Sequence, residues 1–85
     1  MNQNDVWVYM SQIKDWSNLE DIACFIEDEL DDGIPIDFPT LFDYLYDLWN
    51  GGILDRRWTR YEFEFKITEA GLREVKEIEN YGRNQ

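Results

Sequence analysis

The side chains best suited to chemistry in this sequence are carboxylates, and most of them lie in one segment. From Asp15 to Asp55 the chain carries twelve Asp or Glu and no Lys or Arg over 41 residues. The other 44 residues hold eight basic and seven acidic side chains, so the formal net charge of −11 belongs mainly to that segment. A surface of this sign repels nucleic acid and attracts the basic surfaces that normally bind nucleic acid.

The same residues give little support to catalysis or to a metal site. The sequence contains no histidine, which removes the usual general base and the usual triads. The run that begins at Asp28 is similar to a calcium-binding loop, but its third position is Leu30 and its twelfth is Pro39. Cys24, the single cysteine, has no basic neighbour in sequence and is expected to pack beside an apolar helix stripe. We therefore expect no enzymatic activity, no cofactor and no metal.

Length and composition indicate one domain in a reducing compartment. Eighty-five residues, 44% hydrophobic and 16% aromatic, can form a single core. No apolar run approaches the roughly 20 residues of a membrane span, and the N-terminus lacks the pattern of a signal peptide. A lone cysteine excludes an internal disulfide. We expect one domain over residues 1–80, a flexible tail over residues 81–85, no membrane association and a cytoplasmic location.

The elements that must position the carboxylates are predicted to be helices. Apolar residues recur at helical spacing over Asp5–Trp16, from Ser17 to about Leu30, and over Pro39–Asn50. The acidic residues of the second and third of these helices project away from the apolar stripe. The segment therefore places its carboxylates on the surface.

Caps set the expected helix starts. Asn4 or Asp5 is the predicted N-cap of the first helix. Ser17 and Glu20 have the spacing of a capping box, in which Ser17 accepts from the Glu20 amide. Pro39 suits the first turn of the third helix.

After the third helix the period of the apolar residues changes from 3.6 to 2. Tyr61–Ile67 alternates aromatic or apolar residues with charged ones, which predicts a half-buried strand. Ile53–Trp58 is the predicted partner strand, with the reversal near Thr59-Arg60. Thr68 is the predicted cap of a last helix that runs from Glu69 to about Asn80.

The predicted hairpin carries the positive charge that the helices lack. Arg56 and Arg57 lie on its first strand, and Arg60 lies at the reversal. Cross-strand pairing of Arg56 and Arg57 with Glu62 or Glu64 is the ordinary expectation.

Three helices, a two-stranded hairpin and a closing helix, in this order, resemble a winged-helix domain. The stretches Leu48–Arg57 and Tyr61–Leu72 are similar to the end of the recognition helix, the wing and the following helix of MarR- and PadR-like regulators. The resemblance implies a small α+β winged-helix domain in which Pro39–Asn50 is the recognition helix. It also implies three wing residues: Arg56, Arg57 and Arg60.

The predicted recognition helix departs from those families because it presents no positive charge. A helix that enters the major groove presents Arg, Lys, Asn, Gln or Ser. This one presents Asp43, Asp47 and Asn50. Since Lys and Arg at phosphates supply most non-specific affinity, direct binding of nucleic acid through this face is not expected.

The leading hypothesis from the sequence is that the acidic helices bind a basic surface of a protein that handles nucleic acid. Seven carboxylates over residues 18–32 span about 21 Å, at a rise of about 1.5 Å per residue. Their spacing of roughly 3 Å is close to the charge spacing along one DNA strand. The chain would then be a DNA-mimicking inhibitor or modulator, such as a phage or mobile-element anti-defence or anti-CRISPR protein in the host cytoplasm. The candidate partner-binding residues are Glu20, Asp21, Glu27, Asp28, Asp31, Asp32, Asp43 and Asp47.

The alternative hypothesis is a small dimeric winged-helix transcription regulator that contacts DNA through its wing. The first and last helices would supply the dimer contact, which the aromatic residues Trp7, Tyr9, Trp16 and Tyr81 permit. In this alternative the three wing arginines contact phosphates.

Overall fold

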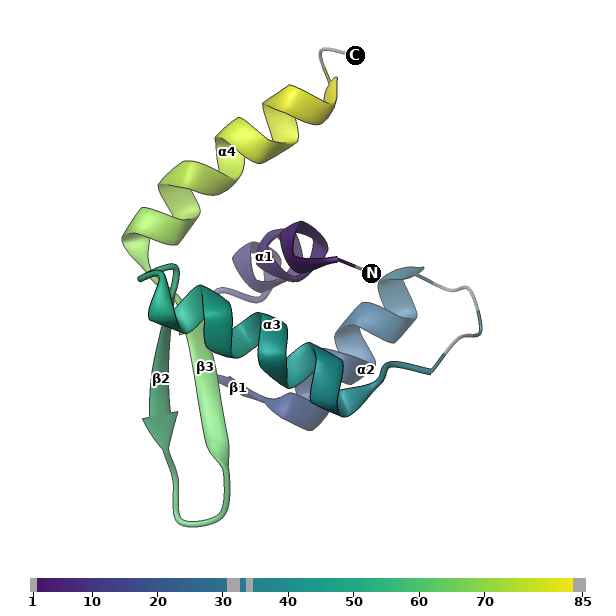
Figure 1. Cartoon of the computed structure of the whole chain (residues 1–85), viewed down its shortest axis with the longest axis vertical. Coiled ribbons are helices and arrows are strands. Elements are labelled where there is room, and N and C mark those ends of the chain that lie inside the picture. Colours follow the sequence, from purple (N-terminus) through teal and green to yellow (C-terminus); the bar gives the residue numbers. More distant parts are fainter. Residues whose placement is uncertain (1, 31–32, 34, 84–85) are drawn as a thin grey trace.

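The chain folds into four helices and a three-stranded antiparallel sheet (Figure 1). The structure, a computed structural model, describes residues 2–30, residue 33 and residues 35–83, of which residues 78–83 are described by their backbone alone. The α+β fold class predicted from the sequence is confirmed. In chain order the elements are α1 (Gln3–Ile13), β1 (Ser17–Asn18), α2 (Leu19–Leu30), α3 (Phe38–Asn50), β2 (Leu54–Trp58), β3 (Phe63–Ile67) and α4 (Glu69–Arg83).

Helix α1 begins earlier and ends earlier than the sequence predicts. Asn2 is its N-cap: the Asn2 side chain accepts from the Asp5 amide at 2.9 Å, and the Asp5 carboxylate accepts from the Asn2 amide at 2.9 Å. The predicted N-cap, Asn4 or Asp5, is therefore wrong, because Asp5 is the third helical residue of a capping box. The helix ends before Trp16 because Lys14 takes the left-handed conformation, with a φ of 61°.

Helix α2 begins one residue later than its predicted capping box allows. Ser17 and Asn18 form the short strand β1, where Ser17 lies opposite Phe65 and Asn18 opposite Glu64. The Asn18 carboxamide oxygen accepts from the Asp21 amide at 2.7 Å. The capping box predicted from Ser17 is wrong, because Ser17 is used in the sheet and the cap moves to Asn18.

The third helix and the hairpin follow the prediction closely. Helix α3 starts one residue before the predicted Pro39 and ends at Asn50, and strands β2 and β3 pair antiparallel with Arg57 opposite Glu64. Strand β3 begins at Phe63, not at the predicted Tyr61, which belongs to the turn and is 83% exposed. The chain reverses at Thr59, whose hydroxyl oxygen accepts from the Glu62 amide at 3.1 Å. The predicted reversal is confirmed.

Helix α4 is joined to the rest of the domain by hydrogen bonds at its first turn. The Thr68 hydroxyl oxygen accepts from the Gly71 amide at 3.0 Å, as its predicted capping role requires, and the hydroxyl donates to the Ile53 carbonyl. The indole N–H of Trp7 donates to the Gly71 carbonyl at 3.0 Å, which joins α1 to α4. Helix α4 runs on to Arg83, beyond the end predicted near Asn80 (Figure 1).

The core lies between α1, α2, α3 and the inner face of the hairpin. Its fully buried side chains include the residues that helical and strand spacing place inward: Val6, Met10, Ile22, Ile26, Leu41, Leu45, Leu54 and Phe65. Cys24, in contrast, is exposed. The prediction that it packs beside the apolar stripe is wrong, because it lies one turn from Glu20 and one turn from Asp28, on the acidic side of α2.

Candidate functional site

The predicted partner-binding carboxylates lie on the surface wherever the structure describes them. Six of them are exposed on α2 and α3: Glu20, Asp21, Glu27, Asp28, Asp43 and Asp47. Asp31 and Asp32 lie outside the described residues. Among the described residues, no group of three or more His, Cys, Asp or Glu side chains is arranged to hold a metal ion. No described helix has the length and apolar character that crossing a membrane requires.

Glu27 has a structural role that the sequence did not indicate. Its carboxylate accepts from the Ile36 amide at 3.0 Å, and this bond ties the connection before α3 to α2. No local sequence pattern indicates this bond, because Glu27 and Ile36 are nine residues apart and only the fold brings them together. Glu27 is therefore a poor choice for testing the acidic surface, whereas the other exposed carboxylates are better ones.

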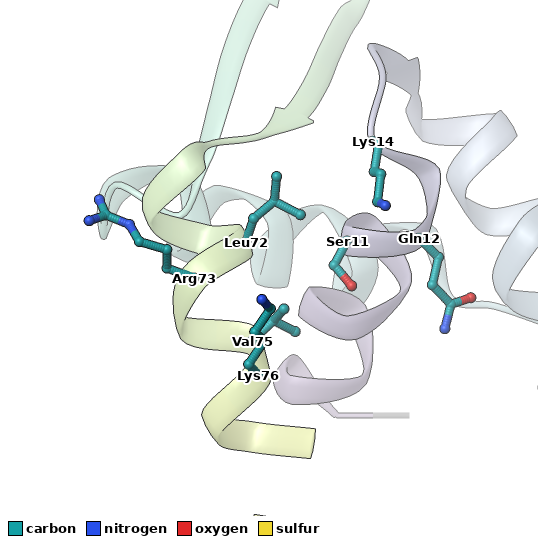
Figure 2. A pocket seen from close by; sticks show the side chains of 7 residues that line it. All are labelled: Ser11, Gln12, Lys14, Leu72, Arg73, Val75 and Lys76. Atoms are coloured by element: carbon teal, nitrogen blue, oxygen red, sulfur yellow. The ribbon is translucent and has the colours of Figure 1, made fainter. Parts of the chain in front are cut away.

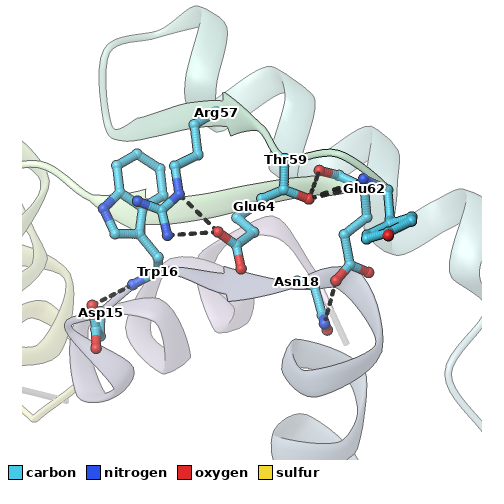
Figure 3. A network of polar contacts seen from close by, with 8 residues as sticks. Asp15, Trp16, Asn18, Arg57, Thr59, Glu62 and Glu64 are labelled. Carbon is cyan, nitrogen blue, oxygen red and sulfur yellow. Dashed lines mark hydrogen bonds and ion pairs between the residues drawn. The ribbon is translucent and has the colours of Figure 1, made fainter.

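Arg57 is neutralised within the sheet. Its guanidinium donates to the Glu64 carboxylate at 2.7 Å from both Nε and a terminal nitrogen, and it lies 4.4 Å from the centre of the Trp16 ring (Figure 3). The predicted cross-strand pairing is confirmed for this arginine. Its charge is already shared with Glu64, which weakens Arg57 as a contact for phosphate.

Arg56 lies on the opposite face of the hairpin, toward α3. Its guanidinium carbon is 3.9 Å from the centre of the Trp49 ring, 4.7 Å from that of Phe63 and 5.8 Å from that of Tyr46. A cation over several aromatic faces stabilises the arrangement that holds it. Arg56 therefore joins the wing to α3 and is not presented at the wing tip.

Arg60, at the turn, is exposed and makes no ion pair with any residue that the structure describes. Arg57 is exposed as well, but its charge is paired with Glu64. Two large side chains flank Arg60 on the surface: Trp58 is 63% exposed and Tyr61 is 83% exposed. The wing tip thus presents one cation and two aromatic rings.

A groove separates the wing from the first turns of α2 and α3. It has a volume of about 550 Å³ and a mainly aromatic lining. We call it the aromatic groove. Its lining residues are Leu19, Glu20, Phe38, Phe42, Trp58, Glu62, Phe63 and Phe65.

A second hollow of about 540 Å³ lies between α1 and α4, and its charge is positive (Figure 2). It collects three of the chain's eight basic side chains, although Arg73 points away from α1. The sequence did not indicate this hollow, because Lys14 and Lys76 are far apart in the chain and line the same hollow only when α4 packs on α1. We call it the basic pocket, lined by Ser11, Gln12, Lys14, Leu72, Arg73, Val75 and Lys76.

Comparison with known proteins identifies the class of the fold. The chain matches no family model and no curated protein sequence. Among solved structures it is similar to a transcriptional regulator from Clostridium thermocellum, with a TM-score of 0.75 and 18% identity over 96% of this chain and 81% of that one. It is also similar to SSV1 F-93, with a TM-score of 0.63 and 18% identity over 100% of this chain and 94% of that one.

At this level of identity the likeness concerns the fold. The winged-helix-like fold predicted from the sequence is confirmed, and β2 and β3 form its hairpin. The assignment of α3 as a recognition helix stays a prediction. The closer resemblance to MarR- and PadR-like regulators stays a prediction.

Proposed function

We propose that this chain is a small winged-helix transcription regulator that works in the cytoplasm and contacts DNA through its wing. The observation that carries the proposal is the fold similarity to a transcriptional regulator over 96% of the chain. This is the alternative of the two functions that the sequence suggested. The exposed wing tip supplies the surface that such a protein needs.

The proposed contact is the turn that carries Arg60. An exposed guanidinium can bind a backbone phosphate, and contacts of this kind set the position of a protein on DNA. Tyr61 and Trp58 are exposed beside it and can contact the sugar edge of the duplex. Helix α3 is expected to stay out of the major groove, because Asp43 and Asp47 are exposed on it and would face phosphates.

A dimer would bring two wings to one duplex. Helices α1 and α4 are the proposed contact, because α4 extends past the body of the domain (Figure 1). An open hollow also lies between the two helices. A two-fold dimer of this kind would read two half-sites, as symmetric regulators do. The sequence predicted the same pair of helices for this role.

The test is fluorescence anisotropy with labelled duplex DNA at salt concentrations from about 50 to about 200 mM. Over this range each phosphate contact contributes about 0.9 to the slope of log K against log salt concentration. We expect weak binding of mixed-sequence duplex at low salt. Arg60→Ala should weaken that binding and reduce the slope by about 1 for each wing engaged. Lys66→Ala is the matched control, since it removes one positive charge from β3 at the register position of Asp55, away from the turn and outside the hollow between α1 and α4. Equal binding by the two variants would contradict the wing contact.

A second candidate function is favoured by the exposed acidic surface. Arg56 and Arg57 are engaged within the chain, and the described carboxylates of α2 and α3 face solvent. These facts support the other function suggested by the sequence, a DNA mimic that binds a basic nucleic-acid-handling protein. In that case wild-type protein does not bind duplex at any salt concentration in the same assay, whereas the charge reversal Asp43→Lys with Asp47→Lys creates binding.

A further inference from the structure

We propose that the aromatic groove is a binding site for a small aromatic organic cation. The proposal concerns a ligand, and it does not depend on whether the wing contacts DNA. It rests on the shape of the groove, on the charge of its lining and on the cation that the neighbouring rings already hold.

The groove has the dimensions and the lining of a small-molecule site. Its volume of about 550 Å³ falls within the range of roughly 300–1,000 Å³ found for such pockets. Phe65 is fully buried, while Phe38 and Trp58 are 46% and 63% exposed at the surface. These two rings line one groove together with Phe42 and Phe63, and contiguous apolar surface left open to water marks a binding groove.

The charged side chains that line the groove are negative. Its lining includes two carboxylates, Glu20 from α2 and Glu62 from the wing, and no Lys or Arg. Glu62 is held in place because its carboxylate accepts from the Asn18 carboxamide at 2.9 Å (Figure 3). Aromatic faces are negative as well, so rings and carboxylates together favour a cation over a neutral or anionic ligand.

The same aromatic surface already binds a cation belonging to the chain. The Arg56 guanidinium lies over Trp49 and Phe63, and Phe63 also lines the groove. Trp58 packs edge-to-face on Phe63 with their ring centres 4.7 Å apart, which continues the surface toward the wing tip. Among the described residues, the cation–ring contacts involve Arg56 and Arg57, and none reaches the groove rings Phe38 and Trp58. An external cation would lie over Phe38 and Trp58 as the Arg56 guanidinium lies over Trp49 and Phe63.

The test is isothermal titration calorimetry of the full chain with tetraphenylphosphonium, without DNA. Tetraphenylborate is the matched ligand, because it has nearly the same size and shape and the opposite charge. We expect one tetraphenylphosphonium per chain and no measurable binding of tetraphenylborate. Trp58→Ala should weaken binding at least tenfold, while Tyr61→Ala, which removes a more exposed ring outside the groove, should leave it unchanged.

The role of the two carboxylates is separated from net charge by two double variants. Glu20→Gln with Glu62→Gln should weaken binding several-fold. Asp43→Asn with Asp47→Asn makes the same change in net charge on α3, outside the groove, and should have little effect. Glu20→Gln alone keeps the Asn18–Glu62 bond and should show part of the loss, which guards against misfolding of the double variant.

Several outcomes would overturn the proposal. Equal binding of the two tetraphenyl ions would show apolar association without charge selection. Equal losses in the two double variants would show attraction to the whole acidic chain. Binding of an arginine-rich peptide at the groove in the absence of any tetraphenylphosphonium binding would assign the groove to a protein partner. The calorimetric titrations contain no DNA, so their results do not depend on whether the anisotropy assay detects DNA binding. The proposed ligand site and the proposed regulator function can therefore be contradicted independently.

Discussion

Gly71 is the residue at which three elements meet. A Cβ at this position would lie 2.6 Å from the Ile53 carbonyl oxygen and 2.8 Å from a side-chain carbon of Ile67. The Ile53 carbonyl cannot easily move, because it accepts from both the hydroxyl and the amide of Thr68. The Gly71 carbonyl in turn accepts from the Trp7 indole. The backbones approach each other so closely at this point that only a residue without a side chain fits.

Replacing this glycine should therefore destabilise the domain. We expect Gly71→Ala to lower the free energy of unfolding by about 2–3 kcal/mol. The added methyl group would overlap the Ile53 carbonyl oxygen, so the backbone of α4 or of Ile53 must shift. The measurement is the midpoint of urea denaturation. Glu74→Ala, at an exposed position of the same helix, is the control and should change the midpoint little. An unchanged midpoint in Gly71→Ala would show that α4 can move away from the sheet without cost.

At the scale of elements, the start of α2 depends on one carboxamide. Asn18 accepts from the Asp21 amide, which caps the helix, and donates to Glu62, which holds the wing. Because Asn18 is also in strand β1, it fixes helix, sheet and wing relative to one another. The two-residue strand has no period of its own, so no alternation pattern could reveal it in the sequence.

Substitutions at the two neighbouring positions distinguish the predicted cap from the observed one. Asn18→Ala should lower the free energy of unfolding by about 1–2 kcal/mol, because it leaves the first turn of α2 without its acceptor. Ser17→Ala should cost much less. Thermal denaturation followed by circular dichroism measures both. The reverse order of the two melting temperatures would support the capping box that the sequence predicts from Ser17.

The elements themselves were largely predictable, and their contacts were not. The change of period after Asn50 located the hairpin, and Thr68 was found as a cap, because both signals are local. The stacking of Arg56 on Trp49 was not predicted, because it exists only when α3 lies against β2. The aromatic groove was missed for the same reason: its lining joins the starts of two helices to the end of the wing.

At the scale of the whole molecule, acidic side chains dominate the surface. Exposed carboxylates lie on α2 and α3 and also on α4, whereas three basic side chains line the basic pocket between α1 and α4. The formal net charge of −11 in 85 residues implies strong self-repulsion within the folded chain. Repulsion between exposed charges is screened by salt.

Stability should therefore rise with ionic strength. Raising salt from about 10 mM to about 150 mM shortens the screening length from roughly 30 Å to roughly 8 Å. We expect the melting temperature to rise by several degrees, since about 1 kcal/mol corresponds to roughly 4–8 °C in a domain of this size. Asp43→Asn with Asp47→Asn should reduce the rise. A melting temperature that falls as salt is added would show that the Arg57–Glu64 pair outweighs the repulsion.

The order of the strands, β1-β3-β2, has a consequence for how the protein behaves at high concentration. One rim of the sheet is formed by β1, which is only two residues long, and the other by β2, which carries Asp55, Arg56 and Arg57 in succession. Short or charged rims discourage a strand of a second molecule from pairing there, so they oppose aggregation into fibrils. The chain can thus leave Trp58 and Tyr61 open to water at the end of the wing without the sheet polymerising.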